Sequence, residues 1–488
     1  MSVLPTDSCF YVIGTFTDSV SPVKAGALWG KIDLAGNLLD IKTFHHPGKD
    51  YFNDFGDIRS TPEGYLYNAG SHNDTAFSTQ IIFYLYNQEG DTLLTRLYRS
   101  ILYPSANFVL PFGIFQRPGN GYAIVCVHDT SNNPPNSDIS LLLIDTAYQI
   151  EGYFSYAHTS RHEIPASLLP DGDGGYIIGA ERTNDGQVYI NYDNRTLIIK
   201  TDSTGVQKWQ WLSPAGVLQD EAKAMIKTPD GGLVVASGIG QEIGNNPNIH
   251  TLIWDGLIFK LDADRNVVWS TQLRGSDVPG GGGTELTEMV EAPDGSGYVA
   301  SAIVLELAPG WPNGYFTSSL MKVSAEGDSL WARRYTYFDG EFVAPEVFDM
   351  KATPDGGYVL VGYTVNQFNI VTNPIVPAWI MKVDSFGCLI PGCHLTNATE
   401  GTDKVVLSLA VYPNPVDDFL NFQLRGVQST KNATFRIVNM EGKVVQDIKS
   451  VNVQATVTVP VSGWPAGIYF LQCLENGVVI CSEKFVKL

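Results

Sequence analysis

The sequence predicts an all-β chain in which a seven-bladed β-propeller of four-stranded blades is followed by a small β-sandwich. Three observations support this prediction. The 488 residues include 48 Gly, 27 Pro, 23 Tyr and 23 Phe, and only 17% of them are charged. Two short units each recur seven times within residues 9–394, whereas residues 405–488 follow a separate pattern with a period of two. This combination is typical of many short strands joined by tight turns.

The first recurring unit is a turn that contains Pro and Gly and is followed by an apolar run. Thr228-Pro-Asp-Gly-Gly-Leu233 and Thr353-Pro-Asp-Gly-Gly-Tyr358 are typical examples. Pro fixes φ and Gly supplies the positive φ of a tight reversal, so each unit predicts strand, turn and strand. The turn prolines stand at positions 62, 118, 170, 229, 293 and 354, and a seventh strand of this type, Phe10–Gly14, lacks the turn.

The second recurring unit is an apolar strand that ends in an acidic or small polar residue, as in Ile258-Phe-Lys-Leu-Asp262. Lys stands two residues before this end in five of the seven units, and we expect its ammonium group to reach water. Trp stands seven residues after the end in three successive units, where packing between blades is a more common role than ligand binding. These tryptophans are Trp209, Trp269 and Trp331.

Each period therefore supplies four strands, and both units give a count of seven. Four-stranded sheets repeated at this spacing pack radially as a propeller. The first unit has no clear opening strand, so either residues 2–9 complete it or the two ends of the repeat region share a blade. The repeats resemble quinoprotein-like and related secreted bacterial propellers, in which an Asp-x-x-Gly turn precedes a Trp-bearing strand.

Four of the six cysteines stand in pairs that could form disulfides. Cys388 and Cys393 enclose only four residues, and Cys473 and Cys481 flank an Asn-Gly turn on a predicted hairpin. The alternative is that these are ordinary buried thiols. Disulfides would indicate an oxidising compartment.

Residues 395–404 are polar and predict a linker, and residues 405–488 predict a sandwich of six or seven strands. This last module closely resembles the type A C-terminal sorting domain of type IX secretion substrates. The resemblance depends on Tyr412-Pro413-Asn414-Pro415, Gly442 with Lys443, Gly467-Ile-Tyr469, and the ending Lys484-Phe-Val-Lys487-Leu488.

The resemblance implies a bacterium of the Bacteroidota type and export across its outer membrane by the type IX machinery. The protein would then be secreted or held at the outer-membrane surface. Met1–Cys9 lacks the basic start and apolar core of a signal peptide. We therefore expect the numbering to begin after a removed signal.

Charge and hydropathy exclude two classes of partner. The formal net charge is −20, and almost all of the acidic excess lies before residue 405, so the body would repel the phosphates of a nucleic acid. No segment contains the ~20 uninterrupted apolar residues that a membrane helix needs.

The sequence shows no catalytic constellation, metal site or cofactor motif. His158 and His162 have a chelating spacing only on a helix, where none is predicted. Asp171-Gly-Asp173 could share a calcium ion but lacks the distal Glu of an EF-hand, so an insertion in a turn is the simpler interpretation. No P-loop, Gly-x-Ser-x-Gly elbow or adjacent Cys pair occurs.

Long loops that carry aromatic residues are the candidate ligand sites, with Trp254, Trp311 and Tyr315 as the candidate contacts. Three functions remain open. The first is a non-catalytic secreted protein that recognises a glycan or a protein, the second is an extracellular enzyme acting on polysaccharide, and the third is a spacer in a surface assembly. The sequence favours the first.

Overall fold

A computed structural model gives the structure of the chain. It describes residues 1–17, 25–45, 50–52, 57–73, 79–98, 109–119, 121–129, 137–156, 161–184, 194–215, 219–243, 251–274, 283–308, 311–335, 343–366, 378–389, 393, 408–425, 433–439, 443–448, 456–475 and 478–488. The chain divides into two compact units, Met1–Pro391 and Gly392–Leu488. The predicted linker, residues 395–404, lies outside the described residues. No helix in the described part of the chain is long and apolar enough to cross a bilayer.

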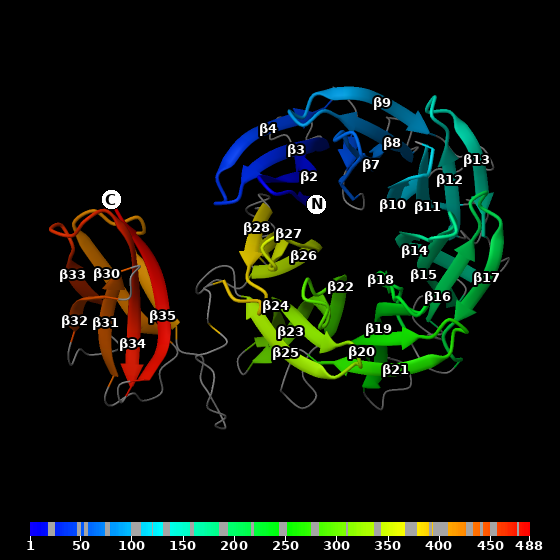
Figure 1. The fold of residues 1–488 in the computed structure, drawn as a ribbon. Helices are drawn as coiled ribbons and strands as arrows, with labels where there is room; N and C mark the ends of the chain where they lie inside the picture. The colour runs from blue at the N-terminus through cyan, green and yellow to red at the C-terminus, as the bar shows by residue number, and fades with distance from the viewer. Residues whose placement is uncertain are drawn as a thin grey trace. The chain divides into compact units, whose positions relative to one another are not determined.

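The first unit is a ring of antiparallel sheets, of which the described residues form seven, called sheets 1 to 7 in chain order (Figure 1). The repeat predicts four strands a sheet, and five sheets have this form. Sheet 1 contains β1 (Ser2–Pro5), β2 (Cys9–Thr17), β3 (Ala25–Asp33) and β4 (Leu38–Phe44). Sheet 2 contains β5 (Asp50–Phe52), β6 (Arg59–Ser60), β7 (Leu66–Asn73), β8 (Thr79–Tyr86) and β9 (Thr92–Tyr98), with β5 and β6 both pairing with β7.

Sheets 3 to 6 have four strands each, and sheet 7 has three described strands. Sheet 3 contains β10 (Val109–Gln116), β11 (Tyr122–Asp129), β12 (Ser137–Ile144) and β13 (Ile150–Ser155). Sheet 4 contains β14 (Arg161–Pro170), β15 (Tyr176–Asn184), β16 (Arg195–Thr201) and β17 (Gln207–Leu212). Sheet 5 contains β18 (Ala224–Lys227), β19 (Leu233–Ile243), β20 (Thr251–Leu261) and β21 (Val267–Leu273). Sheet 6 contains β22 (Thr284–Glu291), β23 (Gly297–Ala308), β24 (Trp311–Ser324) and β25 (Ser329–Tyr335). Sheet 7 contains β26 (Val343–Ala352), β27 (Tyr358–Asn366) and β28 (Ala378–Val383).

The cores of the ring lie between the sheets. Each of seven buried apolar clusters joins two sheets that are consecutive in the chain or, in one case, the last sheet to the first. In that closing cluster, Val359 and Val361 of sheet 7 pack against Val3, Phe10 and Val12 of sheet 1. Wedge-like packing of this kind around an axis is what defines a β-propeller. The all-β propeller predicted from the sequence is therefore confirmed.

The N-terminal strand closes the ring. Strand β1 begins at Ser2 and pairs with β2, so residues 2–5 supply the opening strand that the repeat lacks. The Oδ2 of Asp349 in sheet 7 accepts hydrogen bonds from the Ser2 hydroxyl (2.5 Å) and from the Val3 backbone N–H (2.9 Å). The propeller thus includes residues before position 9. In the described residues, the opening strand of sheet 1 comes from residues 2–5 and not from the other end of the repeat region.

The recurring lysines correct one expectation. In four of the five, the ammonium group binds the carboxylate of the Pro-Gly turn in the same sheet, because the turn and the lysine lie at the same end of the sheet. Lys31 instead donates to the Gln88 carbonyl at 3.5 Å. The Nζ–Oδ distances are 2.7 Å for Lys200–Asp173, 2.7 Å for Lys260–Asp230, 3.6 Å for Lys322–Asp294 and 2.9 Å for Lys382–Asp355. Hydrogen bonds from Lys260, followed by those from Thr228, hold the pKa of Asp230 well below its usual range.

The tryptophan at the fourth strand packs between sheets, as predicted. Trp269 of sheet 5 lies against Gly327 in a turn of sheet 6, where a Cβ atom would come within 2.6 Å of the indole. The φ of Gly327 is +95°, so both the close approach and the backbone conformation require glycine here.

The second unit is a sandwich of two antiparallel sheets. One contains β29 (Ser408–Tyr412), β30 (Phe419–Arg425) and β33 (Val457–Pro460), and the other contains β31 (Ala433–Asn439), β32 (Val444–Ile448), β34 (Gly467–Glu475) and β35 (Val478–Lys487). Buried residues from both sheets, among them Phe422, Phe435 and Phe485, form its core.

Candidate functional site

The first strands of the sheets place polar residues at the centre of the ring. Figure 1 shows β10, β14, β18, β22 and β26 nearest to that centre. Several of these strands carry a β-bulge; in β22 it falls between Leu286 and Glu288, and in β26 between Val347 and Asp349. A bulge adds one unpaired residue and redirects the side chains that follow it, which is why bulges often occur beside functional sites.

One position of the repeat brings three carboxylates together. Asp57, Glu288 and Asp349 each stand five residues before the turn proline of their sheet. The strand register puts Ser2 at the same position of sheet 1, because Pro5 pairs with Phe10 as Ala352 pairs with Tyr358. Four sheets that are adjacent around the ring, sheets 6, 7, 1 and 2, thus contribute equivalent positions to one group.

This group, together with two basic residues, is called the central cluster, and its members are Ser2, Asp57, Arg59, Glu288, Asp349 and Lys351. Lys351 is its hub. The Lys351 ammonium forms an ion pair with Asp349 and lies 4.0 Å from Asp57 Oδ1 and 4.0 Å from Glu288 Oε2. Since Asp57 Oδ1 and Glu288 Oε2 are equally far from one nitrogen, they can be separated by at most twice that distance.

Arg59 fixes the other side of the cluster. Its Nη2 lies 2.5 Å from Asp57 Oδ2, and its guanidinium stands 3.7 Å from the centre of the Phe115 ring. The Ser2 hydroxyl, which donates to Asp349, also accepts a hydrogen bond from the Ile58 backbone N–H at 3.2 Å. The cluster is therefore held by contacts that cross three boundaries between sheets.

The surroundings shift the pKa values of two carboxyls in opposite directions. Burial, with smaller contributions from Asp349 and Asp57, raises the pKa of Glu288 to about 7, although Lys351 opposes the shift. Burial also acts to raise the pKa of Asp57, but the charges of Arg59 and Lys351 outweigh it and hold that pKa below its ordinary value. Below a pH of about 7, Glu288 is thus mostly protonated while Asp57 is ionised, and a carboxylic acid beside a carboxylate is the arrangement used in acid–base catalysis.

A cavity of about 530 Å³ opens beside the central cluster. Arg59 and Lys351 form part of its wall, together with Leu4, Tyr67 and Phe115. The side chains of Asp57 and Glu288 are 28% and 23% exposed, so both remain accessible from solvent. We call this space the first cavity.

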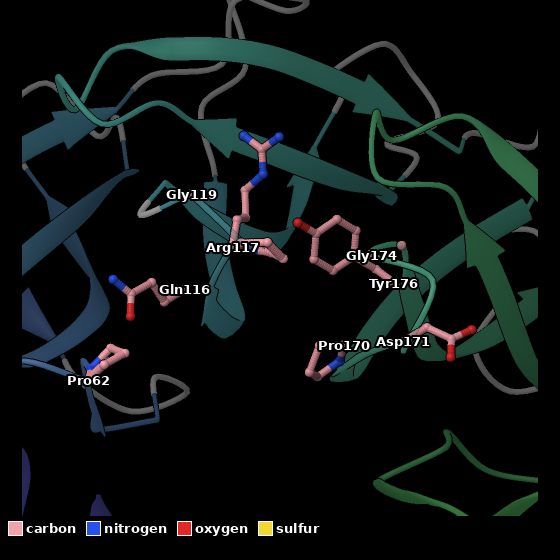
Figure 2. A pocket seen from close by; sticks show the side chains of 10 residues that line it. Pro62, Gln116, Arg117, Gly119, Pro170, Asp171, Gly174 and Tyr176 are labelled. Atoms are coloured by element: carbon pink, nitrogen blue, oxygen red, sulfur yellow. The ribbon is translucent and has the colours of Figure 1, made fainter.

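A second cavity, of about 360 Å³, adjoins the first, because Pro62 and Gln116 line both. In Figure 2, Pro62 and Gln116 lie on one side of this second cavity and Pro170 and Asp171 on the other. Arg117, Pro118 and Tyr176 complete much of the wall.

A second group of charged residues, called the acidic cluster, lies on sheets 4, 5 and 6 and contains Glu181, Asp220, Glu221, Lys223 and Glu285. One oxygen from each of the three carboxyls Glu181, Asp220 and Glu221 lies within 4.8 Å of the others. Burial and the neighbouring carboxylates raise the pKa of Glu181 to about 8. Burial and Glu221 raise that of Asp220 to about 6. Lys223 pairs with Glu221 and, at 3.1 Å, with Glu285.

Of the predicted ligand contacts, the structure describes the side chain of Trp254, which lines neither cavity. Trp254 is half-buried on β20 and packs over Gly238. The backbones of Trp311 and Tyr315 belong to β24, but their side chains lie outside the described residues. These three residues stay predictions.

The central cluster was missed in the sequence because Asp, Glu and Lys are common at strand ends. A signal was present, however: a carboxylate recurs five residues before the turn proline in three of the six turns. Aligning the repeats on that proline would have drawn attention to Asp57, Glu288 and Asp349.

The residues whose spacing was weighed for metal binding have other partners. Asp171 pairs with Lys200 at 3.0 Å and with Lys227, and Asp173 pairs with Lys200. His162 Nδ1 accepts a hydrogen bond from the Ser137 backbone N–H at 3.2 Å, whereas His158 lies outside the described residues.

The cysteine pairs differ in what the structure describes. Cys388 and Cys393 are both disulfide-bonded. Cys473 and Cys481 stand opposite each other on β34 and β35, and the side chain of Cys481 lies outside the described residues.

The residues of the predicted sorting signal link the two ends of the sandwich. The Asn414 side chain accepts a hydrogen bond from the Val486 N–H (2.9 Å) and donates one to the Lys484 carbonyl (3.2 Å). Lys487 is buried, with its ammonium 3.6 Å from Asp417. The first motif, Tyr412-Pro413-Asn414-Pro415, is thereby tied to the last strand.

The remaining residues of the signal have separate positions. Tyr469 is buried and donates to the Pro465 carbonyl at 2.8 Å. Gly467 begins β34 with φ of +157°. Gly442 lies outside the described residues.

Comparison with known proteins agrees with this organisation. Residues 410–487 match the family described as Secretion system C-terminal sorting domain. No curated protein matches the chain by sequence. The quinoprotein-like part of the propeller resemblance stays a prediction.

Three solved structures are similar to this chain at low identity and with TM-scores below 0.5. An ulvan lyase, a polysaccharide lyase, is 10% identical with a TM-score of 0.47, over 79% of this chain and 92% of that one. An endo-arabinase from Bacteroides thetaiotaomicron is 9% identical with a TM-score of 0.36, over 68% and 93%. An α-L-arabinanase from Penicillium chrysogenum is 12% identical with a TM-score of 0.42, over 68% and 95%. What the comparisons show of the whole chain is that it carries a C-terminal sorting domain of the type IX secretion system and is a secreted or cell-surface protein.

Proposed function

We propose that the propeller is an extracellular enzyme that hydrolyses glycosidic bonds in a polysaccharide, with Glu288 as general acid and Asp57 as the second carboxylate. The single observation that carries this proposal is the central cluster: two carboxyls of opposite protonation preference lie around Lys351, beside an open cavity. Export and a polar cavity fit an extracellular carbohydrate substrate.

The chemistry follows from the two protonation states. Glu288, whose pKa is raised to about 7, keeps a proton that it can donate to the oxygen of the leaving sugar. Asp57 stays ionised beside Arg59 and Lys351, and it either removes a proton from water or attacks the anomeric carbon. The upper limit of twice 4.0 Å between the two carboxyl oxygens is compatible with both routes, which use separations from roughly 5 to 9.5 Å.

Lys351 and Arg59 act through Asp57. Their positive charges favour the carboxylate form, and the ion pair with Asp349 holds the Lys351 ammonium in place. We therefore assign them as positioning residues. Phe115 and Tyr67 form part of the apolar wall of the cavity, and the Arg59 guanidinium lies 3.7 Å from the centre of the Phe115 ring.

The test is hydrolysis of a panel of soluble polysaccharides by the purified full chain, measured as release of reducing ends. Glu288→Gln keeps the shape of the side chain but has no proton to donate, so turnover is expected to fall about 10²–10⁴-fold. Glu285→Gln, on the same strand β22, is the matched control and is expected to retain activity. Binding of a glycan without turnover would instead support the non-catalytic binding protein that the sequence favours, and silence in both assays would support the spacer.

A further inference from the structure

We propose that the two cavities form one continuous groove and that the enzyme therefore acts on the interior of long polysaccharide chains, with the second cavity as a remote sugar subsite. This inference rests on the proposed function and names its substrate class. Pro62 and Gln116 belong to the walls of both cavities, so the two spaces are adjacent and meet at these two residues.

The groove has the extent that a polymer needs. The first cavity takes its wall from sheets 7, 1, 2 and 3, and the second cavity takes its wall from sheets 2, 3 and 4. Volumes of about 530 and 360 Å³ each fall in the range of ligand sites, roughly 300–1,000 Å³. A substrate of one or two sugars would fill only the first, whereas a chain passing over Gln116 would occupy both.

The wall of the second cavity suits a sugar chain better than an ion. Both of its charged residues already have a partner: Arg117 pairs with Glu151, and Asp171 pairs with Lys200 and Lys227. The other lining residues are mostly prolines and glycines, with Gln116 and Tyr176 between them (Figure 2). Exposed proline rings and backbone edges offer flat apolar contact next to hydrogen-bonding groups, as the two faces of a pyranose or furanose require.

The repeat supplies a matched pair of variants for the test. Pro118 and Pro293 are both exposed and both stand at the proline position of a Pro-Gly turn, in sheets 3 and 6. Pro118 lines the second cavity, whereas Pro293 lines neither cavity. The position after the first residue of a type I or type II turn has an ordinary negative φ that tryptophan can adopt, and Pro118→Trp places an indole over the second cavity.

The experiment measures kcat/KM of the full chain on soluble xylan, arabinan, pectin and laminarin, and on a trisaccharide with the linkage of whichever polymer is cleaved. Pro118→Trp is expected to lower kcat/KM on the polymer by about tenfold and to change it less than about twofold on the trisaccharide. Pro293→Trp is expected to match the wild type on both. Thermal unfolding of the two variants checks that both are folded.

The early products of the wild type give a second readout that needs no variant. Cleavage inside the chain releases a mixture of oligosaccharides from the first minutes, whereas cleavage from an end releases one short product. Equal activity of Pro118→Trp and Pro293→Trp on the polymer, or a single short early product, would overturn the extended groove while leaving the proposed hydrolysis in place. No cleavage of any polymer would instead reject the proposed function.

Discussion

The central cluster and the acidic cluster are built alike and yet differ in what they can do. Both gather carboxyls around one lysine at the inner edges of neighbouring sheets. In the central cluster the two pKa values diverge, and Arg59 and Lys351 face a cavity. In the acidic cluster the pKa values of Glu181 and Asp220 both rise, and none of its residues lines either cavity.

The difference teaches that a gathering of charges is not a site by itself. A second basic residue, Arg59, is what holds Asp57 ionised while Glu288 keeps its proton. The basic residues differ as well, because Arg59 and Lys351 line a cavity whereas Lys223 lines neither cavity. The first two predictions test whether chemistry belongs to the central cluster, and the last two test what each cluster contributes to stability.

The largest expected effect is on turnover. Asp57→Asn removes the ionised carboxylate and leaves the size of the side chain unchanged, so kcat on the cleaved polysaccharide should fall about 10²–10⁴-fold. Glu221→Gln in the acidic cluster should change kcat less than about twofold. Equal losses in the two variants would remove the distinction between the clusters.

The pH dependence of kcat/KM gives the next effect. Glu288 must be protonated to act as an acid, and its pKa is about 7. Activity should therefore be full below that pH and fall about tenfold for each pH unit above it. Because Asp57 stays ionised to lower pH than an ordinary aspartate, the acidic limb should lie well below the basic one. A profile that stays flat between pH 6 and 9 would contradict the assignment of Glu288.

The acidic cluster should affect stability in a pH-dependent way. The pKa of Glu181 rises from 4.5 to about 8 on folding, so the folded state binds the extra proton and its stability falls as pH increases between these values. Glu181→Gln is neutral throughout and should raise the free energy of unfolding at pH 8 by about 1–3 kcal/mol, with little gain at pH 4.5. Urea unfolding at the two pH values measures this, with the exposed Glu291→Gln as control.

The smallest expected effect concerns the strand that closes the ring. Ser2→Ala removes the hydroxyl that links Asp349 to the Ile58 N–H, so the free energy of unfolding should fall by about 1 kcal/mol. Because Asp349 holds the Lys351 ammonium, a several-fold loss of kcat is also expected. Thr6→Ala, in the turn after β1, is the control for stability without an effect on turnover.

Much of the architecture could be predicted because the same turn and strand patterns recur many times along the chain. The Pro-Gly turns marked the passage from first to second strand, and Trp269 packs between sheets as its repeated position indicated. The partners of the recurring lysines were missed. The sequence shows that lysine recurs at the position of Lys260, but it does not show that Asp230 of the turn lies beside that lysine.

The candidate site could not be predicted from these local patterns. Asp57 and Glu288 are separated by 231 positions in the chain and meet only because sheets 6 and 2 lie on either side of the ring closure. No local pattern reports that closure, since Ser2 and Asp349 come from opposite ends of the propeller.

The sequence by itself determined the all-β class, the repeated four-stranded sheets and the C-terminal sorting domain, because turn chemistry, alternation and short motifs are local properties of the chain. The tertiary structure decided which charges meet, how their pKa values diverge and where a cavity opens. Those depend on distances between residues that only the closed ring brings together, and on the burial that follows from packing its sheets.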